Sequence, residues 1–135
     1  MNIQHINNKK YTDGIFYNQL LQLIQTASIE FDKWSHEVIL NKNSEDKVLQ
    51  ESLTSRFLCA KELYFNAFDA IAFYRIRRYI CNSVWNDFFL PQIKLLAEKF
   101  EIPESFANIK QVLEMENNPA KEEVETEQKS EGENK

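Results

Sequence analysis

Glycine and proline are scarce in this chain, and this scarcity constrains the fold more than any other feature of the sequence. Of 135 residues, only two are glycine and three are proline. Antiparallel sheets need a tight turn every several residues, and those turns depend on glycine or on Asn-Gly pairs. Hydrophobic residues nevertheless make up 43% of the chain, which is enough to build a core. We therefore expect an all-α protein in which long helices are joined by few loops.

The first helix is predicted to follow Asp13, which is placed to cap its start. Hydrophobic residues then recur at helical steps and fall within about 100° of arc, the width of one core-facing stripe. The stripe consists of Phe16, Leu20, Leu23, Ile24, Ala27, Phe31, Trp34 and Val38. The pattern predicts a helix of about 25 residues.

The second helix is predicted to run from Glu45, capped by Ser44, to about Tyr79. Its main stripe consists of Leu49, Leu53, Phe57, Ala60, Tyr64, Ala67, Ile71 and Tyr74. A further apolar edge is formed by Leu58, Phe65, Ala72 and Ile76. A helix that is apolar over so wide an arc is usually central. We interpret the extra edge as an interface with a second chain, most simply in a symmetric homodimer.

The third helix is predicted to begin at Asn82 or Ser83 and is interrupted by Pro91. Proline removes one amide donor, so the helix must either kink or restart there, and the sequence leaves both alternatives open. Pro103 is placed at the first position of a short closing helix. The expected architecture is a bundle of three long helices plus a short C-terminal helix, mainly antiparallel.

The two ends of the chain differ in composition from its middle. We expect residues 1–12 to be a polar, weakly ordered segment and residues 13–116 to form the helical bundle domain. Residues 117–135 contain six glutamates and three lysines, and Val124 is their one strong hydrophobe. Such a composition cannot offset the entropy of ordering. We therefore predict a disordered acidic tail at 117–135.

The sequence lacks the residues that common catalytic and cofactor-binding motifs require. Because Gly14 and Gly132 are the only glycines, no phosphate-binding or dinucleotide-binding loop is possible. The two histidines are too far apart in sequence for a local zinc site. The two cysteines, Cys59 and Cys81, lie in apolar helical context and are interpreted as packed thiols. We expect no catalytic residue, no metal and no cofactor.

One basic and aromatic cluster is the best candidate for a binding site. It consists of Tyr74, Arg75, Arg77, Arg78 and Tyr79. Arginine beside tyrosine can anchor a protein interface, or grip phosphates and stack on bases. The same cations also suit the negative end of a helix dipole, which is the structural alternative.

The charge balance ranks the possible functions. The tail carries −3 of the net charge of −5, which leaves −2 on the rest of the chain. A near-neutral body favours a protein partner over nucleic acid. We expect a non-enzymatic interaction protein, such as an adaptor, an inhibitor or a subunit of a larger assembly. The alternative is a nucleic-acid-associated regulator that uses Arg75–Arg78, and an enzyme with a site assembled from His36 and scattered carboxylates ranks last.

The sequence also bears on location. No uncharged apolar run reaches the ~18 residues of a membrane span, and the first residues lack the apolar region of a signal peptide. We expect a cytoplasmic protein with no membrane partner.

Overall fold

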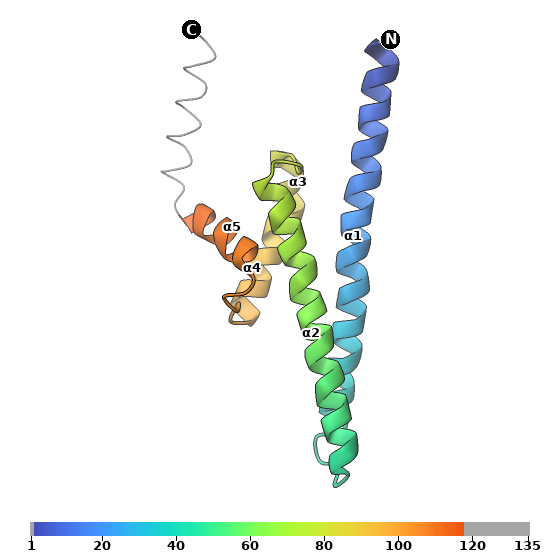
Figure 1. Cartoon of the computed structure of the whole chain (residues 1–135), viewed down its shortest axis with the longest axis vertical. Helices are drawn as coiled ribbons and strands as arrows, with labels where there is room; N and C mark the ends of the chain where they lie inside the picture. The colour runs from blue at the N-terminus through green and yellow to red at the C-terminus, as the bar shows by residue number, and fades with distance from the viewer. Residues whose placement is uncertain (1, 118–135) are drawn as a thin grey trace. The chain divides into compact units, whose positions relative to one another are not determined.

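A computed structural model describes the backbone of residues 2–117 and the side chains of residues 14–117. All regular elements in this part of the chain are helices (Figure 1), which confirms the predicted all-α class. No described helix is both long and apolar enough to cross a membrane. The predicted disorder of the tail after residue 117 lies outside the described residues, as do the side chains of the N-terminal segment 1–12.

The chain divides into two compact units, Met1–Phe68 and Asp69–Lys135. The first unit contains α1 (Asn2–Leu40) and the beginning of α2 (Lys47–Ile76). Because α1 begins at Asn2, Asp13 lies inside the helix, and its prediction as an N-cap was wrong. No glycine or proline interrupts the helix before that point, so the backbone bonding continues through it.

The start of α2 is capped two residues later than predicted. Asp46 Oδ1 accepts the Leu49 N–H at 3.1 Å, whereas Ser44 Oγ accepts the Asp46 N–H at 3.2 Å. Asp46 is therefore the N-cap, and Ser44 supports the cap. A carboxylate at this position also complements the positive end of the helix dipole.

The turn between α1 and α2 is tied by side-chain amides. Asn41 Nδ2 donates to the Glu37 carbonyl at 2.8 Å, which satisfies one of the last carbonyls of α1. Gln50 Nε2 lies within 3.2 Å of the carbonyl oxygens of Asn41, Lys42 and Ser44. The turn is thus stabilised without glycine.

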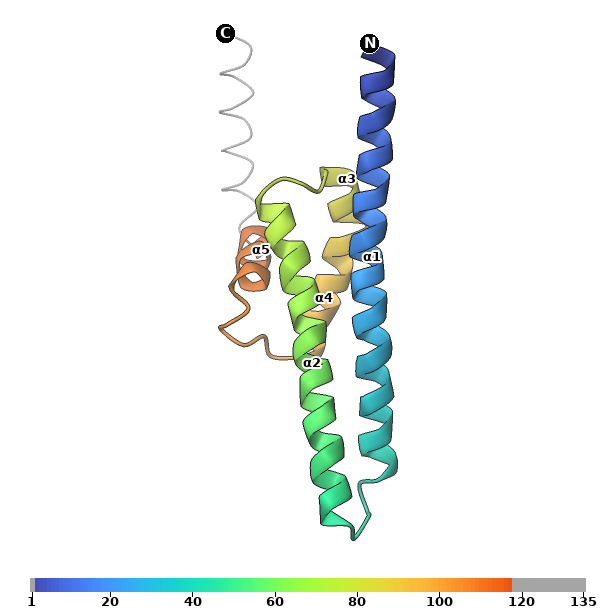
Figure 2. The same ribbon diagram turned by 45° about the vertical axis from the view of Figure 1, so that its right-hand side comes forward.

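Aromatic rings join α1 to the first part of α2, and the two lie side by side (Figures 1 and 2). The ring of Phe31 stacks on Tyr64 at 4.9 Å and lies 5.5 Å from Phe57. Tyr64 in turn meets Phe68 edge-on at 5.1 Å. All of these residues except Phe68 belong to the predicted stripes, which therefore identified the contacting faces.

The second unit contains the end of α2 and four short elements. These are α3 (Asn82–Val84), the π-helix η1 (Trp85–Phe89), α4 (Leu90–Lys99) and α5 (Ala107–Asn117). Pro91 lies in the first turn of α4. The helix widens into the π-form just before it, and the Leu90 N–H bonds to the Trp85 carbonyl. The helical path therefore continues past Pro91 by a local change of winding.

The closing helix starts later than predicted. Pro103 is not its first residue, because its carbonyl accepts the Phe106 N–H at 3.0 Å in a turn that precedes α5. The start at Ala107 is set by a tertiary hydrogen bond, since Asp69 of α2 accepts the Ile109 N–H at 3.0 Å.

Buried hydrophobic side chains are unevenly distributed between the units. Of nineteen in the described part of the chain, twelve lie after residue 68. They include Ile93 and Ile109, each with no exposed surface, and Phe89, which is 1% exposed. In the described part of α1, the buried apolar side chains are Leu20 and Ile24, and the others are half-buried or exposed.

Candidate interaction surfaces

The predicted basic cluster lies where α2 ends, and backbone bonds define its shape. Arg78 has a φ of 64°, in the left-handed region. Its N–H donates to the Arg75 carbonyl and the Tyr79 N–H donates to the Tyr74 carbonyl, both at 2.9 Å. The rings of Tyr74 and Tyr79 meet at 6.3 Å. These are the bonds and the hydrophobic contact of a Schellman motif, with arginine where glycine is usual.

Arg75 is committed to the fold of the second unit. Its Nη1 donates to the Ile80 carbonyl at 2.9 Å, and its guanidinium lies 5.7 Å from the centre of the Trp85 ring. Both Arg75 and Tyr74 are half-buried. The sequence prediction grouped Arg75 with the other two arginines, but the structure separates it from them.

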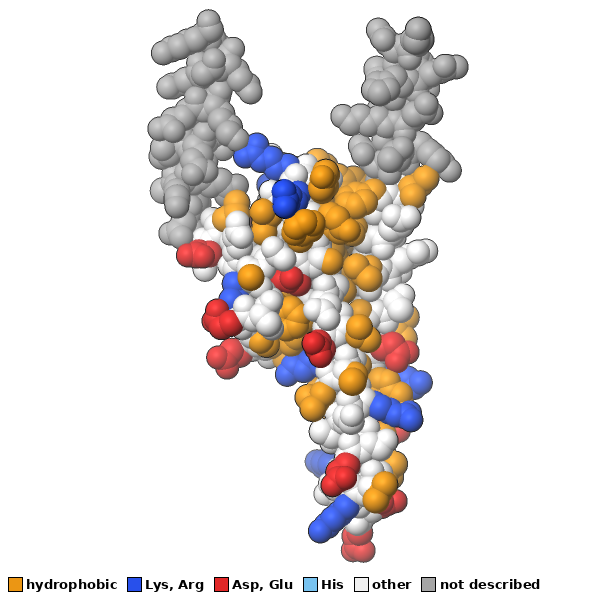
Figure 3. All heavy atoms as spheres, viewed as in Figure 1, with side chains coloured by type: hydrophobic (Ala, Val, Ile, Leu, Met, Phe, Trp, Pro, Cys, Tyr) orange, Lys and Arg blue, Asp and Glu red, His pale blue; other side chains and the backbone are white. Residues whose placement is uncertain are grey.

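Arg77 and Arg78 are exposed, and neither forms an ion pair with any residue in the described ranges. The Arg77 guanidinium lies 5.3 Å from the ring centre of Phe73, which is 38% exposed. Tyr79 is 63% exposed. Figure 3 shows cationic side chains beside hydrophobic ones over this end of α2. We call Phe73, Arg77, Arg78 and Tyr79 the arginine patch.

The four residues predicted as an oligomer interface do not share one exposed surface. Phe65 is 2% exposed and Ala72 is fully buried, whereas Leu58 is 54% exposed and Ile76 is half-buried. Phe65 and Ala72 are covered by the chain's own packing, and the interface itself stays a prediction. A second chain could reach this edge only through Leu58 and the exposed part of Ile76.

Exposed apolar side chains are also distributed along α1 and α2 on either side of their turn, and the sequence analysis did not identify most of them as exposed. Between Ile29 and Cys59 the structure buries only Leu53. Six large apolar side chains there have exposed fractions from 38% to 78%. We call this set the turn surface: Ile29, Ile39, Leu40, Val48, Leu49 and Leu58. Four of the six, namely Ile29, Ile39, Leu40 and Val48, lie outside the predicted stripes and outside the further apolar edge of the second helix. This position was the feature of the sequence that could have indicated their exposure.

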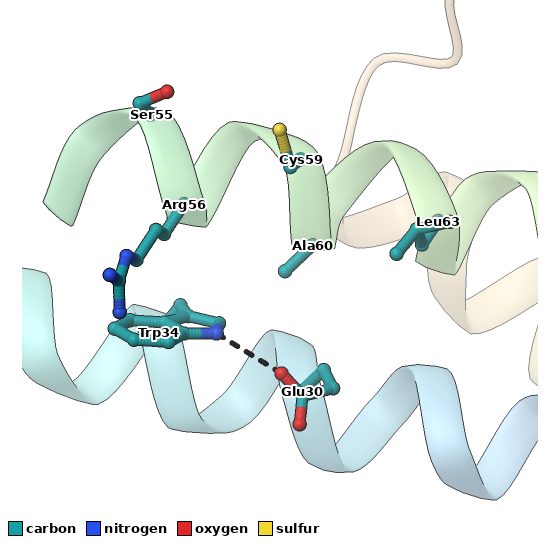
Figure 4. Close-up of a pocket in the computed structure, with 7 residues that line it drawn as sticks. All are labelled: Glu30, Trp34, Ser55, Arg56, Cys59, Ala60 and Leu63. Carbon is teal, nitrogen blue, oxygen red and sulfur yellow. Dashed lines mark hydrogen bonds between the residues drawn. The ribbon is translucent and has the colours of Figure 1, made fainter. Parts of the chain in front are cut away.

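A small groove lies between α1 and α2 around Trp34 (Figure 4). The indole N–H donates to Glu30 Oε2 at 3.1 Å. The charged groups of Lys33 and Arg56 each lie 4.9 Å from the centre of the indole ring. The lining is completed by Ser55, Cys59, Ala60 and Leu63. Trp34 is thus held by a hydrogen bond to a carboxylate and by two cation–π contacts.

Two side chains with nucleophilic atoms, Ser55 and Cys59, line the groove. Ser55 and Cys59 point away from Trp34 in Figure 4, and no base hydrogen-bonds to either in the structure of residues 14–117. His36, the other candidate, is exposed at the surface of α1. No group of three His, Cys, Asp or Glu side chains within the described part is placed to hold a metal ion.

Burial raises the pKa of the Tyr64 phenol above its ordinary value, and the negative charge of Asp32 adds to the shift. The two residues come from α2 and α1 of the first unit. The Tyr64 phenol is therefore neutral at physiological pH.

Comparisons with known proteins add no family: no family model, no curated protein and no solved structure matches this chain. The described residues offer two candidate interaction surfaces, the arginine patch and the turn surface.

Proposed function

We propose that this chain is a non-enzymatic protein–protein interaction module: an adaptor, an inhibitor or a subunit of a larger assembly. The turn surface is the observation that supports this proposal. Complete burial of a Val, Leu or Ile side chain contributes about 1.5–3 kcal/mol relative to exposure. Ile39 and Leu40 are each 64% exposed and Val48 is 78% exposed. Covering the turn surface would therefore supply several kcal/mol to a complex.

The partner fitted to such a surface is a protein with an apolar helical face. In this proposal the helices form a mainly antiparallel bundle, and the partner completes the packing that α1 and α2 leave open around their turn. A second copy of the chain is the simplest form of this partner. We place the complex in the cytoplasm, as the sequence predicts.

Affinity capture with matched variants tests the proposal. The affinity-tagged chain is compared with Ile39→Gln/Val48→Gln, which removes two exposed side chains from the turn surface. Leu95→Gln/Met115→Gln is the control, since these residues are 49% and 44% exposed on α4 and α5. We expect one stoichiometric protein to copurify with the wild type and the control, and to be lost from the Ile39/Val48 variant. The proposal fails if all three chains retain the same proteins, or if none retains any and sedimentation shows a monomer.

A nucleic-acid-associated function is the second candidate, supported by the exposed arginine patch. Arg77 and Arg78 could contact phosphates while Tyr79 stacks on a base. The net charge of −5 opposes this reading. Fluorescence anisotropy of a labelled single-stranded oligonucleotide tests this second candidate function. Binding that weakens steeply with salt and is lost in Arg77→Gln/Arg78→Gln would support this function.

A further inference from the structure

We propose that the arginine patch is an acidic-peptide-binding surface whose occupant in the isolated chain is the chain's own C-terminal segment, residues 118–135. This inference is independent of the turn surface and concerns the other unit of the molecule.

The patch presents two cations that the described structure does not neutralise. Arg77 and Arg78 are adjacent, exposed and without a carboxylate partner between residues 14 and 117. Other arginines are accommodated differently, since Arg75 donates to the Ile80 carbonyl and Arg56 lies against Trp34. Two neighbouring positive charges repel each other, so an anionic counterpart stabilises them.

The backbone conformation of Arg78 is energetically unfavourable for a residue with a side chain. A residue with a Cβ in the left-handed region costs about 1–2 kcal/mol, and glycine would avoid that cost. Arg78 occupies this position with a φ of 64°. The two Schellman hydrogen bonds hold the backbone in this conformation, and both Arg77 and Arg78 are exposed there. Residue 78 therefore carries a charged side chain at a left-handed position where glycine would have the lower conformational free energy.

The segment after Asn117 has the complementary chemistry. Residues 118–135 contain six glutamates and three lysines, for a net charge of −3. Their glutamates are Glu122, Glu123, Glu125, Glu127, Glu131 and Glu133. The exposed rings of Phe73 and Tyr79 add apolar area on which the stems of glutamate side chains can pack.

The segment also starts in the right place. It follows α5, which belongs to the same unit as the end of α2. Both views show the end of α5 near the end of α2 (Figures 1 and 2). Eighteen extended residues span at most about 60 Å, far more than this separation requires. Each exposed ion pair contributes only about 0–1 kcal/mol, but a short tether raises the effective concentration into the millimolar range.

The experiment uses the full-length chain with one native thiol. Both cysteines are exposed, so their interpretation from the sequence as packed thiols was wrong. Cys81 lies two residues after Tyr79, so a nitroxide spin label on it, with Cys59→Ser as background, reports on the surroundings of the patch. We expect the label to broaden the amide NMR signals of residues 122–133. The broadening should disappear in Arg77→Gln/Arg78→Gln. It should also weaken at about 0.5 M salt, where the Debye length is about 4 Å.

Lys42→Gln/Lys47→Gln is the matched control. It removes two exposed positive charges from the turn between α1 and α2, in the other unit, and should leave the broadening intact. The proposal is overturned if the signals are not broadened, or if Arg77→Gln/Arg78→Gln broadens them as much as the wild type. If the spin label on one copy of the chain broadens the signals of a separate, isotope-labelled copy, the segment binds the patch of another chain. That result would overturn the proposal that the segment binds the patch of its own chain. An oligonucleotide that binds the full-length chain through these arginines at physiological salt would overturn the choice of ligand.

Discussion

The carboxylate of Asp69, on α2, caps the first turn of α5. Oδ1 accepts the Ile109 N–H and Oδ2 accepts the Asn108 Nδ2–H, both at 3.0 Å. Phe106, which precedes the helix, offers no side-chain acceptor for these donors. The cap is therefore supplied by a residue about forty positions earlier, and it docks the last described helix of the second unit.

Replacing Asp69 should loosen that docking. We expect Asp69→Ala to lower the free energy of unfolding by about 1–2 kcal/mol, because a first-turn amide loses its acceptor. Asp69→Asn, which keeps one carbonyl oxygen, should lose less. Glu62→Ala, on the same face of α2 and exposed, should change stability by less than about 0.5 kcal/mol. Urea unfolding of the three variants measures this order, and equal stabilities would contradict the capping role.

Arg78→Gly should stabilise the protein. Glycine adopts the left-handed conformation without the Cβ clash, so we expect a gain of about 0.5–1 kcal/mol in the free energy of unfolding. Arg78→Ala keeps the Cβ and serves as the control, with no comparable gain. Thermal unfolding followed by circular dichroism distinguishes them. A glycine variant no more stable than the alanine variant would show that the left-handed position carries no strain.

Phe65 and Leu58 should respond differently to truncation, although the sequence assigns both to one edge. Phe65→Ala opens a cavity in the core and should cost about 3–5 kcal/mol. Leu58→Ala removes a side chain that is 54% exposed and should cost less than about 1 kcal/mol. Chemical unfolding gives both values. If Leu58→Ala also lowers the sedimenting mass at micromolar concentration, a second chain covers this side chain.

The raised pKa of Tyr64 predicts a loss of stability in alkali. Above about pH 10 an unfolded chain releases this phenolic proton while the folded chain still holds it. The unfolded state then binds fewer protons, so the free energy of unfolding falls as pH rises. The difference in stability between the wild type and Tyr64→Phe should therefore be constant below about pH 9 and change in favour of the variant above pH 10.

Asp32→Asn provides the check on the cause of that shift. It removes the negative charge that adds to the effect of burial, so the alkaline loss attributable to Tyr64 should become smaller. Urea unfolding at several pH values measures both variants. A Tyr64→Phe difference that does not vary with pH would refute the assignment.

Several features followed from the sequence alone because they depend on local chemistry. Scarcity of glycine and proline excluded tight turns and required helices, whatever packs against them. The periodic stripes placed Phe31 and Tyr64 on facing sides because the period of the α-helix fixes which residues share a face. The cluster at the end of α2 was also found, since it is contiguous in the sequence.

The tertiary structure alone decided which of these residues are free to bind. Arg75 and Arg77 are two positions apart, yet the Ile80 carbonyl and the Trp85 indole engage only the first. Phe65 and Leu58 share a helical edge, but burial depends on what surrounds the helix rather than on its period. The start of α5 depends on Asp69, a long-range contact that no local pattern encodes. Periodicity assigns a side chain to a face, whereas only the packed chain determines what covers that face.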